Sequence, residues 1–166
     1  MTVWGRMMIS GAGSAALLAG ALAFQFIGGL APCPLCIWQR WPHVAAVVVA
    51  VLGITVLSRH YRPLAVLGSL AMAISAGLGL YHTGIERGWW QGPDTCTSSG
   101  VGGVSTEDLM AQILAAPLVR CDEVAWEFLS LSMASWNAVI SLGLAALWLA
   151  SAVRAPNPYD SSSASQ

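Results

Sequence analysis

Four long apolar stretches, separated by short polar segments, dominate the pattern of hydrophobic and polar positions along the chain. Asp, Glu, Lys and Arg are all absent from residues 7–39, 41–58, 63–85 and 128–153. A helix needs about 20 apolar residues to cross a bilayer core about 30 Å thick. Each stretch can supply one crossing, the second only just. The pattern therefore predicts four membrane-spanning helices, near residues 8–29, 40–58, 63–82 and 135–153.

The segments that join these spans are short, except for residues 83–134. Within this loop, "STEDLMAQILAAPLVRC" at 105–121 is typical of a short helix that lies in the membrane interface, with acidic residues in its first turn. Residues 155–166 are rich in Pro and Ser, and we expect them to form a disordered tail. The predicted fold is an all-α membrane protein in which residues 1–154 form one four-transmembrane-helix bundle.

The composition supports a membrane protein and argues against a nucleic-acid-binding one. Hydrophobic residues make up 56% of the 166 positions and charged residues only 9%, whereas soluble domains carry about 25% charged residues. The formal net charge is −1, so the chain lacks the basic excess that binds nucleic acid. Membrane lipid is therefore the expected environment.

The arginines indicate how the spans are oriented. Arg59 and Arg62 lie in "SRHYRP", a tight basic loop between the second and third spans. Short loops rich in Lys and Arg stay on the cytoplasmic side of a membrane. With four spans, both termini lie on the same side as this loop. We therefore expect cytoplasmic termini and an extracytoplasmic loop at 83–134.

The order of spans and cysteines predicts that all four thiols meet at one membrane surface. Cys33 and Cys36 follow the first span, and Cys96 and Cys121 lie in the loop after the third. Odd-numbered spans exit on the same face, whichever way the protein is inserted. If that face is extracytoplasmic, disulfides persist there.

The "CPLCIWQR" segment has the features of a reactive dithiol. Cys33 can cap a helix whose first residue is Pro34, which leaves Cys36 in the first helical turn. The helix N-terminus and Arg40, one turn further on, both stabilise the thiolate of Cys36. A stabilised thiolate is a nucleophile and a good leaving group. The guanidinium of Arg40 can also donate hydrogen bonds to a carbonyl oxygen of a lipid-soluble acceptor.

Other uses of four cysteines fit the spacing less well. A c-type haem site requires His after the second Cys, where this chain has Ile37. A four-cysteine zinc site requires a second pair of cysteines close together in sequence, but Cys96 and Cys121 are far apart. We therefore expect no metal site. Two inert disulfides in a non-enzymatic membrane scaffold remain an alternative. A relay between the two pairs accounts better for Arg40 beside the dithiol.

The sequence resembles the DsbB family, the quinone-dependent oxidases that regenerate periplasmic DsbA. The resemblance extends to about residue 153. It rests on "CPLCIWQR", on "YHTGIERG" followed by "GPDTC" between 81 and 96, and on "RCDEVAWEFLSLSMASWN" at 120–137. It implies a bacterial inner-membrane protein that spans the membrane several times, with both termini cytoplasmic and the cysteines periplasmic.

The resemblance also implies roles for the cysteines. Cys96 would form the mixed disulfide with a DsbA-like partner of thioredoxin fold. Cys121 would resolve it and attack Cys33, and Cys36 would be left as the thiolate that faces the quinone.

The quinone site implied by the resemblance includes two further residues. Arg40 would assist the quinone, and His82 aligns with a family histidine placed near the ring. A glutamate can precede the motif arginine in this family, but Gln39 stands here, so a carboxylate role is absent. DsbA is a strong oxidant, at about −120 mV, so its re-oxidation suits ubiquinone better than menaquinone.

An alternative interpretation of the sequence is another class of enzyme. Quinone-linked oxidoreductases of the vitamin K epoxide reductase type share a four-helix core, a membrane C-x-x-C and a loop cysteine pair. In those proteins the loop pair precedes the C-x-x-C, whereas in this chain it follows.

Overall fold

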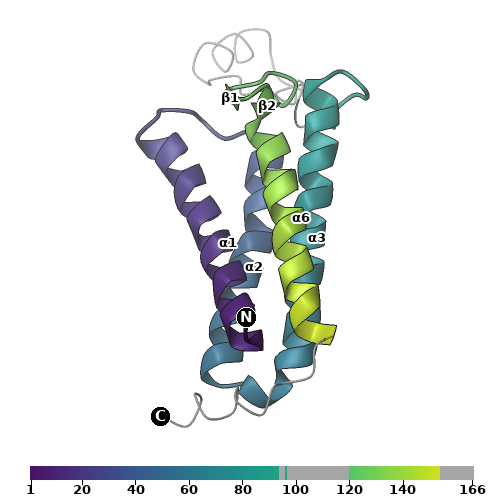
Figure 1. Cartoon of the computed structure of the whole chain (residues 1–166). Coiled ribbons are helices and arrows are strands. Elements are labelled where there is room, and N and C mark those ends of the chain that lie inside the picture. The colour runs from purple at the N-terminus through teal and green to yellow at the C-terminus, as the bar shows by residue number, and fades with distance from the viewer. Residues whose placement is uncertain (94–95, 97–119, 154–166) are drawn as a thin grey trace, which may run out of the picture.

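The computed structural model describes residues 1–93, Cys96 and residues 120–153, and its framework is four long helices (Figure 1). The helices are α1 (Val3–Phe26), α2 (Pro34–Thr55), α3 (Tyr61–Glu86) and α6 (Met133–Val153). Each is long and apolar enough to cross a membrane. This confirms the predicted four-helix membrane fold. The interfacial helix expected at 105–121, except for its last two residues, and the tail expected at 155–166 lie outside the described residues.

Local sequence signals explain where the first two helices begin. Thr2 caps α1, and its Oγ1 accepts a hydrogen bond from the Gly5 N–H at 3.0 Å. Cys33 caps α2, and Pro34 occupies the first turn, where its missing N–H costs nothing. A short 3₁₀ turn, η1 (Ser58–His60), connects α2 to α3, which makes these two helices antiparallel neighbours.

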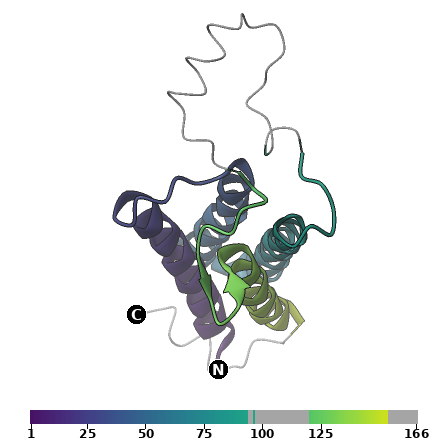
Figure 2. The same ribbon diagram turned by 90° about the horizontal axis from the view of Figure 1, so that it is seen from above.

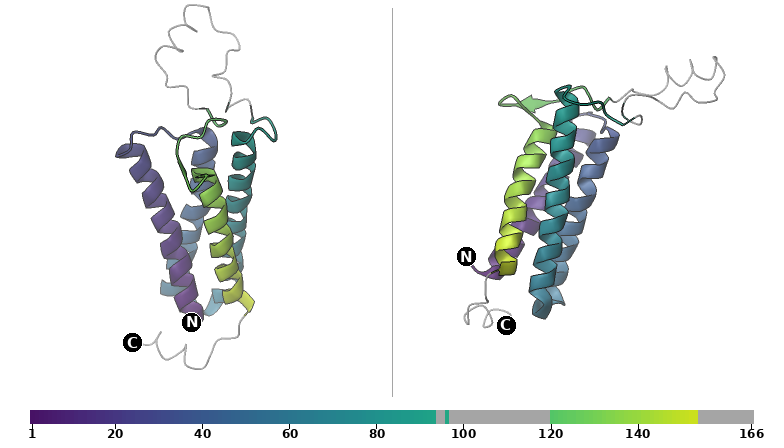
Figure 3. Two further views of the ribbon diagram at one scale, coloured as in Figure 1. Left: turned by 45° about the horizontal axis from the view of Figure 1, so that its top comes forward. Right: turned by 90° about the vertical axis from the view of Figure 1, so that its right-hand side faces the viewer.

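The helices form a ring in which each packs against two others, in the order α1, α2, α3, α6 and back to α1. They run side by side in all views (Figures 1 and 3). The start of α1, the η1 turn and the end of α6 lie at one end of the bundle. The start of α2 and the end of α3 lie at the other, so the cysteines gather there, as the order of spans predicts.

A small hairpin leads into α6 at the cysteine end of the bundle. Strands β1 (Glu127–Phe128) and β2 (Leu131–Ser132) are antiparallel, with Glu127 opposite Ser132. Both residues of the turn between them have positive φ, 52° and 60°, as tight hairpin turns require. Seen from above, the segment that contains the hairpin crosses the end of the bundle (Figure 2).

The bundle is apolar outside and rich in small and polar residues inside, as expected when lipid is the solvent. Large exposed side chains on the helices include Val48, Val51, Leu67, Leu70, Ile74, Leu142 and Leu149. Fully buried serines include Ser10, Ser14, Ser75, Ser141 and Ser151. Gly68 allows close contact, because a Cβ there would lie 2.5 Å from the ring of Trp148, which is completely buried.

The helix ends differ from the expected spans because charged residues continue some helices instead of ending them. Helix α1 includes Arg6, whose buried guanidinium donates to the backbone carbonyls of Ala150 and Met1 at 2.6 and 2.9 Å. Helix α3 continues four residues beyond the expected end at 82 and includes Glu86, which bonds to Ser132. Helix α2 starts at Pro34, six residues before the expected span, so the dithiol belongs to its first turn.

Candidate functional site

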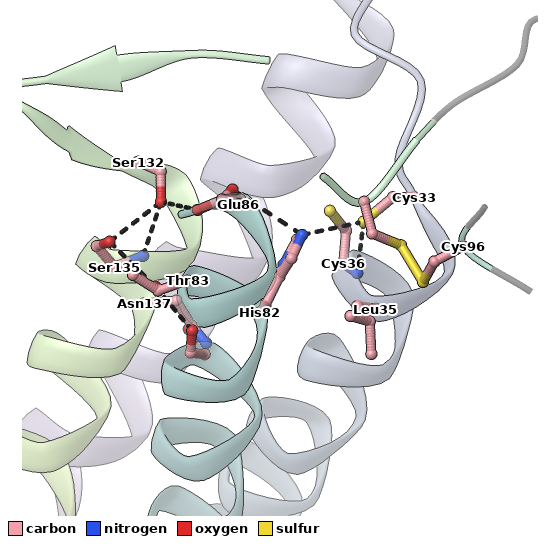
Figure 4. Close-up of polar contacts among 12 residues, drawn as sticks. Cys33, Leu35, Cys36, His82, Thr83, Glu86, Cys96, Ser132, Ser135 and Asn137 are labelled. Atoms are coloured by element: carbon pink, nitrogen blue, oxygen red, sulfur yellow. Dashed lines mark hydrogen bonds and ion pairs between the residues drawn. A yellow bond between two sulfur atoms is a disulfide. The ribbon is translucent and has the colours of Figure 1, made fainter. Parts of the chain in front are cut away.

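The dithiol lies at the N-terminus of α2, with both sulfurs as free thiols. Cys33 is 3% exposed, and its Sγ accepts a hydrogen bond from the Cys36 N–H at 3.1 Å. Cys36 is partly buried and lines a cavity. The cap expected from the sequence is thus present, and it holds the Cys33 sulfur against the first turn of α2 (Figure 4).

The second pair, Cys96 and Cys121, forms a disulfide that packs directly on the dithiol. Cys96 is 3% exposed and Cys121 is fully buried. Leu35 from α2 and Ile85 from α3 complete the apolar cluster around the sulfurs. Three of the cysteines are therefore buried together and the partly buried Cys36 packs against them, although the second pair lies in a loop far along the chain.

Cys33 is the member of the dithiol that contacts the disulfide. The Sγ atoms of Cys33 and Cys121 and a ring nitrogen of His82 all lie within 4.8 Å of one another. His82 Nε2 is 3.7 Å from the Cys33 Sγ. A hydrogen bond to the Cys36 side chain, together with burial, raises the pKa of the Cys33 thiol far above its ordinary value. Cys33 is therefore held as a thiol.

This cluster also resembles a metal site in its ligand types, but its redox state does not fit one. Metal binding by cysteine requires a thiolate. Cys121 is committed to the disulfide, which leaves only Cys33 and His82 of the three as ligands.

A cavity of about 270 Å³ opens beside Cys36. All four helices contribute to its wall, and the segment after Cys121 covers part of it. Its polar wall residues include Gln39, Arg40, His43, His82, Glu86 and Asn137. The structure therefore brings Cys36, Arg40 and His82, which the sequence singles out, to one site. Their roles stay predictions.

The guanidinium of Arg40, on α2, makes hydrogen bonds to α1. Its Nη1 donates to Oε1 of Gln25 at 2.7 Å, and its Nη2 lies 3.5 Å from the Ala21 carbonyl. Arg40 is only partly buried. Guanidinium has five N–H donors, so these two contacts leave others that can meet a ligand.

A chain of hydrogen bonds runs from the dithiol into the middle of the bundle. The Nδ1 of His82 lies 2.9 Å from Nε2 of Gln39, whose Oε1 accepts from Asn137 at 2.8 Å. Asn137 Oδ1 is 2.9 Å from Nε2 of His43, which also contacts Ser75. Helices α2, α3 and α6 are joined by this network, which crosses the interior of the membrane-spanning part.

Glu86 forms a second polar group above the cavity. Its carboxylate accepts a hydrogen bond from the Ser132 hydroxyl and lies 3.9 Å from His82 Nε2. The Glu86 side chain is only 6% exposed. Ser132 also bonds to Ser135, which bonds to Thr83 (Figure 4). The hairpin before α6 is thereby connected to the end of α3 next to the sulfurs.

The arrangement matches one family over nearly the whole chain. The model for Disulfide bond formation protein DsbB matches residues 5–151. The chain belongs to the DsbB family. Proteins named Disulfide bond formation protein B from a Polaromonas species, Methylococcus capsulatus and Xanthomonas oryzae are 32%, 33% and 35% identical to it. The alignments cover 81%, 81% and 83% of this chain and 81%, 85% and 83% of those relatives. No solved structure gives a significant match.

Membership of the DsbB family confirms the resemblance seen in the sequence. The chain is thus a disulfide-forming oxidoreductase, with four helices that can cross the membrane. The four cysteines, Cys33, Cys36, Cys96 and Cys121, form a redox cluster, and this cluster is its candidate active site.

Sequence reasoning missed several polar residues of this DsbB-family site. Glu86 lies in the "YHTGIERG" motif, but the sequence alone gives it no role, and Gln39 draws attention only because it lacks a carboxylate. His43 and Asn137 were not singled out, although both are rare polar residues in otherwise apolar helices. That rarity was the available signal, because a polar residue inside a membrane helix is a functional candidate by default.

Proposed function

We propose that the chain is a thiol oxidase of the bacterial inner membrane that re-oxidises a periplasmic DsbA-like protein. It passes two electrons through its two cysteine pairs to a membrane quinone. The observation that supports this best is the contact between the pairs. Sulfurs of Cys33 and Cys121 lie within 4.8 Å, and Cys36 lines a cavity among the membrane-spanning helices.

The relay begins with the loop pair. A thiolate of the reduced partner attacks Cys96, which breaks the Cys96–Cys121 disulfide and forms a mixed disulfide. The second partner thiolate then displaces Cys96, and the partner leaves oxidised. Two electrons now reside on Cys96 and Cys121 as thiols, and each exchange conserves one sulfur–sulfur bond.

The second exchange moves these electrons to the dithiol. Cys121 attacks Cys33 of a Cys33–Cys36 disulfide, and Cys36 leaves as a thiolate. Cys96 then attacks Cys121, which restores the loop disulfide and releases Cys33 as a thiol. The product has a Cys96–Cys121 disulfide and two free thiols, which is the redox state of this structure.

The cavity suits a quinone as the final acceptor. Its volume of about 270 Å³ approaches the roughly 300 Å³ at which small-molecule sites begin. Arg40 would donate to a quinone oxygen, and Cys36 and His82 would flank the ring. When bound, a quinone takes up two electrons and two protons from this site and leaves as quinol. The high potential of the DsbA couple favours ubiquinone over menaquinone.

The deciding experiment combines purified chain, reduced DsbA-like protein and a short-chain ubiquinone. We expect one quinol formed per partner disulfide. Cys96→Ser and Cys121→Ser should stop oxidation of the partner but retain quinone reduction by a small dithiol such as dithiothreitol. Cys33→Ser and Cys36→Ser should stop both reactions. Absence of turnover by the folded native chain would instead favour the scaffold with structural disulfides.

A further inference from the structure

A ring nitrogen of His82 lies beside the two sulfurs that link the cysteine pairs. Nε2 of His82 is 3.7 Å from the Cys33 Sγ, a hydrogen-bond distance for the large sulfur atom. The Sγ of Cys121 lies within 4.8 Å of the Cys33 Sγ and of a ring nitrogen of His82. His82 is 3% exposed and Cys121 is fully buried, so water has little access to this group. A negative charge that forms on these sulfurs therefore needs a donor from the protein.

The contacts of the Gln39 amide determine which nitrogen of His82 carries the hydrogen. Gln39 Nε2 donates one hydrogen to the Leu35 carbonyl, 3.1 Å away, and lies 2.9 Å from His82 Nδ1. Gln39 Oε1 accepts from Asn137 at 2.8 Å, which keeps the amide in this orientation. The second amide hydrogen therefore points at Nδ1, and Nδ1 is an acceptor. A neutral imidazole has one donor and one acceptor nitrogen, so Nε2 carries the hydrogen.

The Cys33 sulfur is the side-chain acceptor that this hydrogen can reach in the redox cluster. Oε1 of Glu86 lies 3.9 Å from the same nitrogen, which is too long for a hydrogen bond to oxygen. The Cys121 backbone offers His82 another acceptor. A thiolate competes well with a neutral carbonyl, because hydrogen bonds to charged groups are about twice as strong. The bond from His82 to Cys33 should therefore strengthen whenever that sulfur becomes negative.

We propose that His82 is a catalytic residue of the thiol–disulfide exchange, in which its Nε2–H stabilises Cys33 as a leaving thiolate. This inference rests on the proposed function and adds a role for His82 that does not involve the quinone. Gln39 is the positioning residue, since its amide keeps the hydrogen of His82 on the side of the sulfur. The N–H of Cys36, 3.1 Å from the Cys33 Sγ, is a second donor to the same atom.

The step that His82 assists closes the loop disulfide. The Cys96 thiolate attacks the Sγ of Cys121 in a Cys33–Cys121 disulfide. The bond between Cys96 and Cys121 forms, the bond between Cys121 and Cys33 breaks, and the electron pair of the broken bond leaves on Cys33. The new thiolate then takes up one proton, equal to the one that Cys96 gave up on ionising, and Cys33 becomes the free thiol of this structure. A better stabilised thiolate is a faster leaving group.

The test follows one turnover in the absence of quinone. The full chain with both disulfides formed, stripped of quinone and held in lipid nanodiscs, is mixed with one equivalent of reduced DsbA-like protein. Samples are quenched with acid, free thiols are alkylated, and mass spectrometry identifies the disulfides present at each time. His82→Met removes the ring donor and keeps apolar bulk. His82→Gln is the matched control, because its amide nitrogen can lie near the position of Nε2.

We expect the Cys33–Cys121 disulfide to accumulate in His82→Met. Its resolution should slow about tenfold to hundredfold, which is the range for one hydrogen bond to a charged group. His82→Gln should resolve this disulfide faster than His82→Met, because an amide donor replaces the ring donor.

Three outcomes in a native chain that turns over would overturn the role of His82 and leave the proposed function intact. They are no accumulation in His82→Met, equal accumulation in both variants, or equal slowing of partner oxidation and of resolution, which would indicate a structural role. Failure of the native chain to oxidise the partner would overturn the proposed function and the role of His82 with it.

A second measurement needs no substitution of His82, in case those variants do not fold. The chain with native His82 and a reduced dithiol is labelled with ¹⁵N-histidine and compared with Cys33→Ala. Nε2 of His82 should carry the hydrogen, and its resonance should shift in Cys33→Ala because the sulfur acceptor is lost. A hydrogen on Nδ1, or an Nε2 resonance that is the same in Cys33→Ala, would overturn the proposal.

Discussion

The amide nitrogen of Gln39 lies 2.9 Å from Nδ1 of His82 and also donates to the Leu35 carbonyl at 3.1 Å. Both amide hydrogens are used, so His82 Nδ1 is an acceptor. The ring hydrogen of neutral His82 is therefore on Nε2, which lies 3.7 Å from the Cys33 sulfur. Gln39 thus sets the tautomer of the histidine that contacts the redox cluster.

Gln39→Glu should reverse that tautomer. A carboxylate has no hydrogen to donate, so His82 Nδ1 has to donate to it, and Nε2 becomes an acceptor for the Cys33 S–H. The Leu35 carbonyl also loses this side-chain donor, although it keeps the helical N–H of Gln39, so the free energy of unfolding should fall by about 0.5–1.5 kcal/mol. Histidine ¹⁵N spectra and thermal denaturation measure the two effects. Gln39→Met is the control, since it loses the same bond without introducing an acceptor. A hydrogen that stays on Nε2 in Gln39→Glu would contradict this account.

Replacing Arg40 should weaken quinone binding. Arg40→Met keeps length and apolar bulk but removes the charge, and a hydrogen bond to a charged group contributes about 1.5–3 kcal/mol. We therefore expect the apparent KM for quinone to rise roughly tenfold to hundredfold. Arg40→Lys should fall between, because it keeps charge but loses the planar fork. Gln25→Leu removes the partner that holds Arg40 and should have a smaller effect of the same sign. Steady-state quinone reduction measures all three, and an unchanged KM in Arg40→Met would make Arg40 an interfacial anchor.

The helices and the gathering of the sulfurs could be predicted from the sequence because they follow from one-dimensional rules. Apolar length predicts spans, and their number predicts that Cys33 and Cys121 lie at the same end. The cap formed by Cys33 and Pro34 is also local, and the structure contains it.

The hydrogen-bond network could not be predicted because it depends on how three helices pack. Gln39, His82 and Asn137 come from α2, α3 and α6, and no spacing along the chain reveals that they meet. Burial of Glu86 escaped prediction for a related reason. A charged residue after an apolar run indicates the end of a span. In the structure Glu86 is buried instead, and the Ser132 hydroxyl from the hairpin donates a hydrogen bond to its carboxylate.

The two thiols of the dithiol should differ in reactivity. Cys33 is 3% exposed, and its raised pKa keeps it protonated at neutral pH, whereas Cys36 lines the cavity. A thiol with a raised pKa stays protonated through the pH range in which an ordinary thiol ionises, and it loses its proton only at higher pH. Iodoacetamide at pH 7 should therefore modify Cys36 before Cys33 in the quinone-free dithiol protein. Peptide mass spectrometry over time gives the order, and equal or reversed rates would contradict the assignment.

Thiol labelling can directly test the orientation of the chain in the membrane. In a chain whose four cysteines are replaced by Ser, His60→Cys in η1 and Gln91→Cys shortly after the end of α3 each introduce one exposed thiol. The η1 turn and the end of α3 lie at opposite ends of the bundle. We expect a membrane-impermeant maleimide to label Gln91→Cys in intact bacterial cells with a permeable outer membrane. His60→Cys should react only after the inner membrane is opened. The reverse pattern would put the cysteines on the cytoplasmic side and remove the basis for a periplasmic partner.

Contact between α3 and α6 should be required for the site as well as for the fold. A Cβ at Gly79 would lie 2.9 Å from the Ala134 carbonyl oxygen and 3.0 Å from the Ala138 nitrogen, both in the backbone of α6. Backbone atoms cannot move aside as a side chain can, so Gly79→Leu has to push the helices apart. The cost should be about 1–3 kcal/mol or more.

Gly77 provides a matched control in the same helix. A Cβ there meets nothing within 4 Å, so Gly77→Leu should change the free energy of unfolding by no more than about 0.5 kcal/mol. Because His82 follows Gly79 by one turn and Asn137 lies on α6, only Gly79→Leu should also disturb the bond from Asn137 to Gln39. Thermal denaturation measures the first effect, and ¹⁵N spectra of the Asn137 side chain measure the second. Equal behaviour of the two variants would mean that close packing of α3 and α6 does not hold the network together.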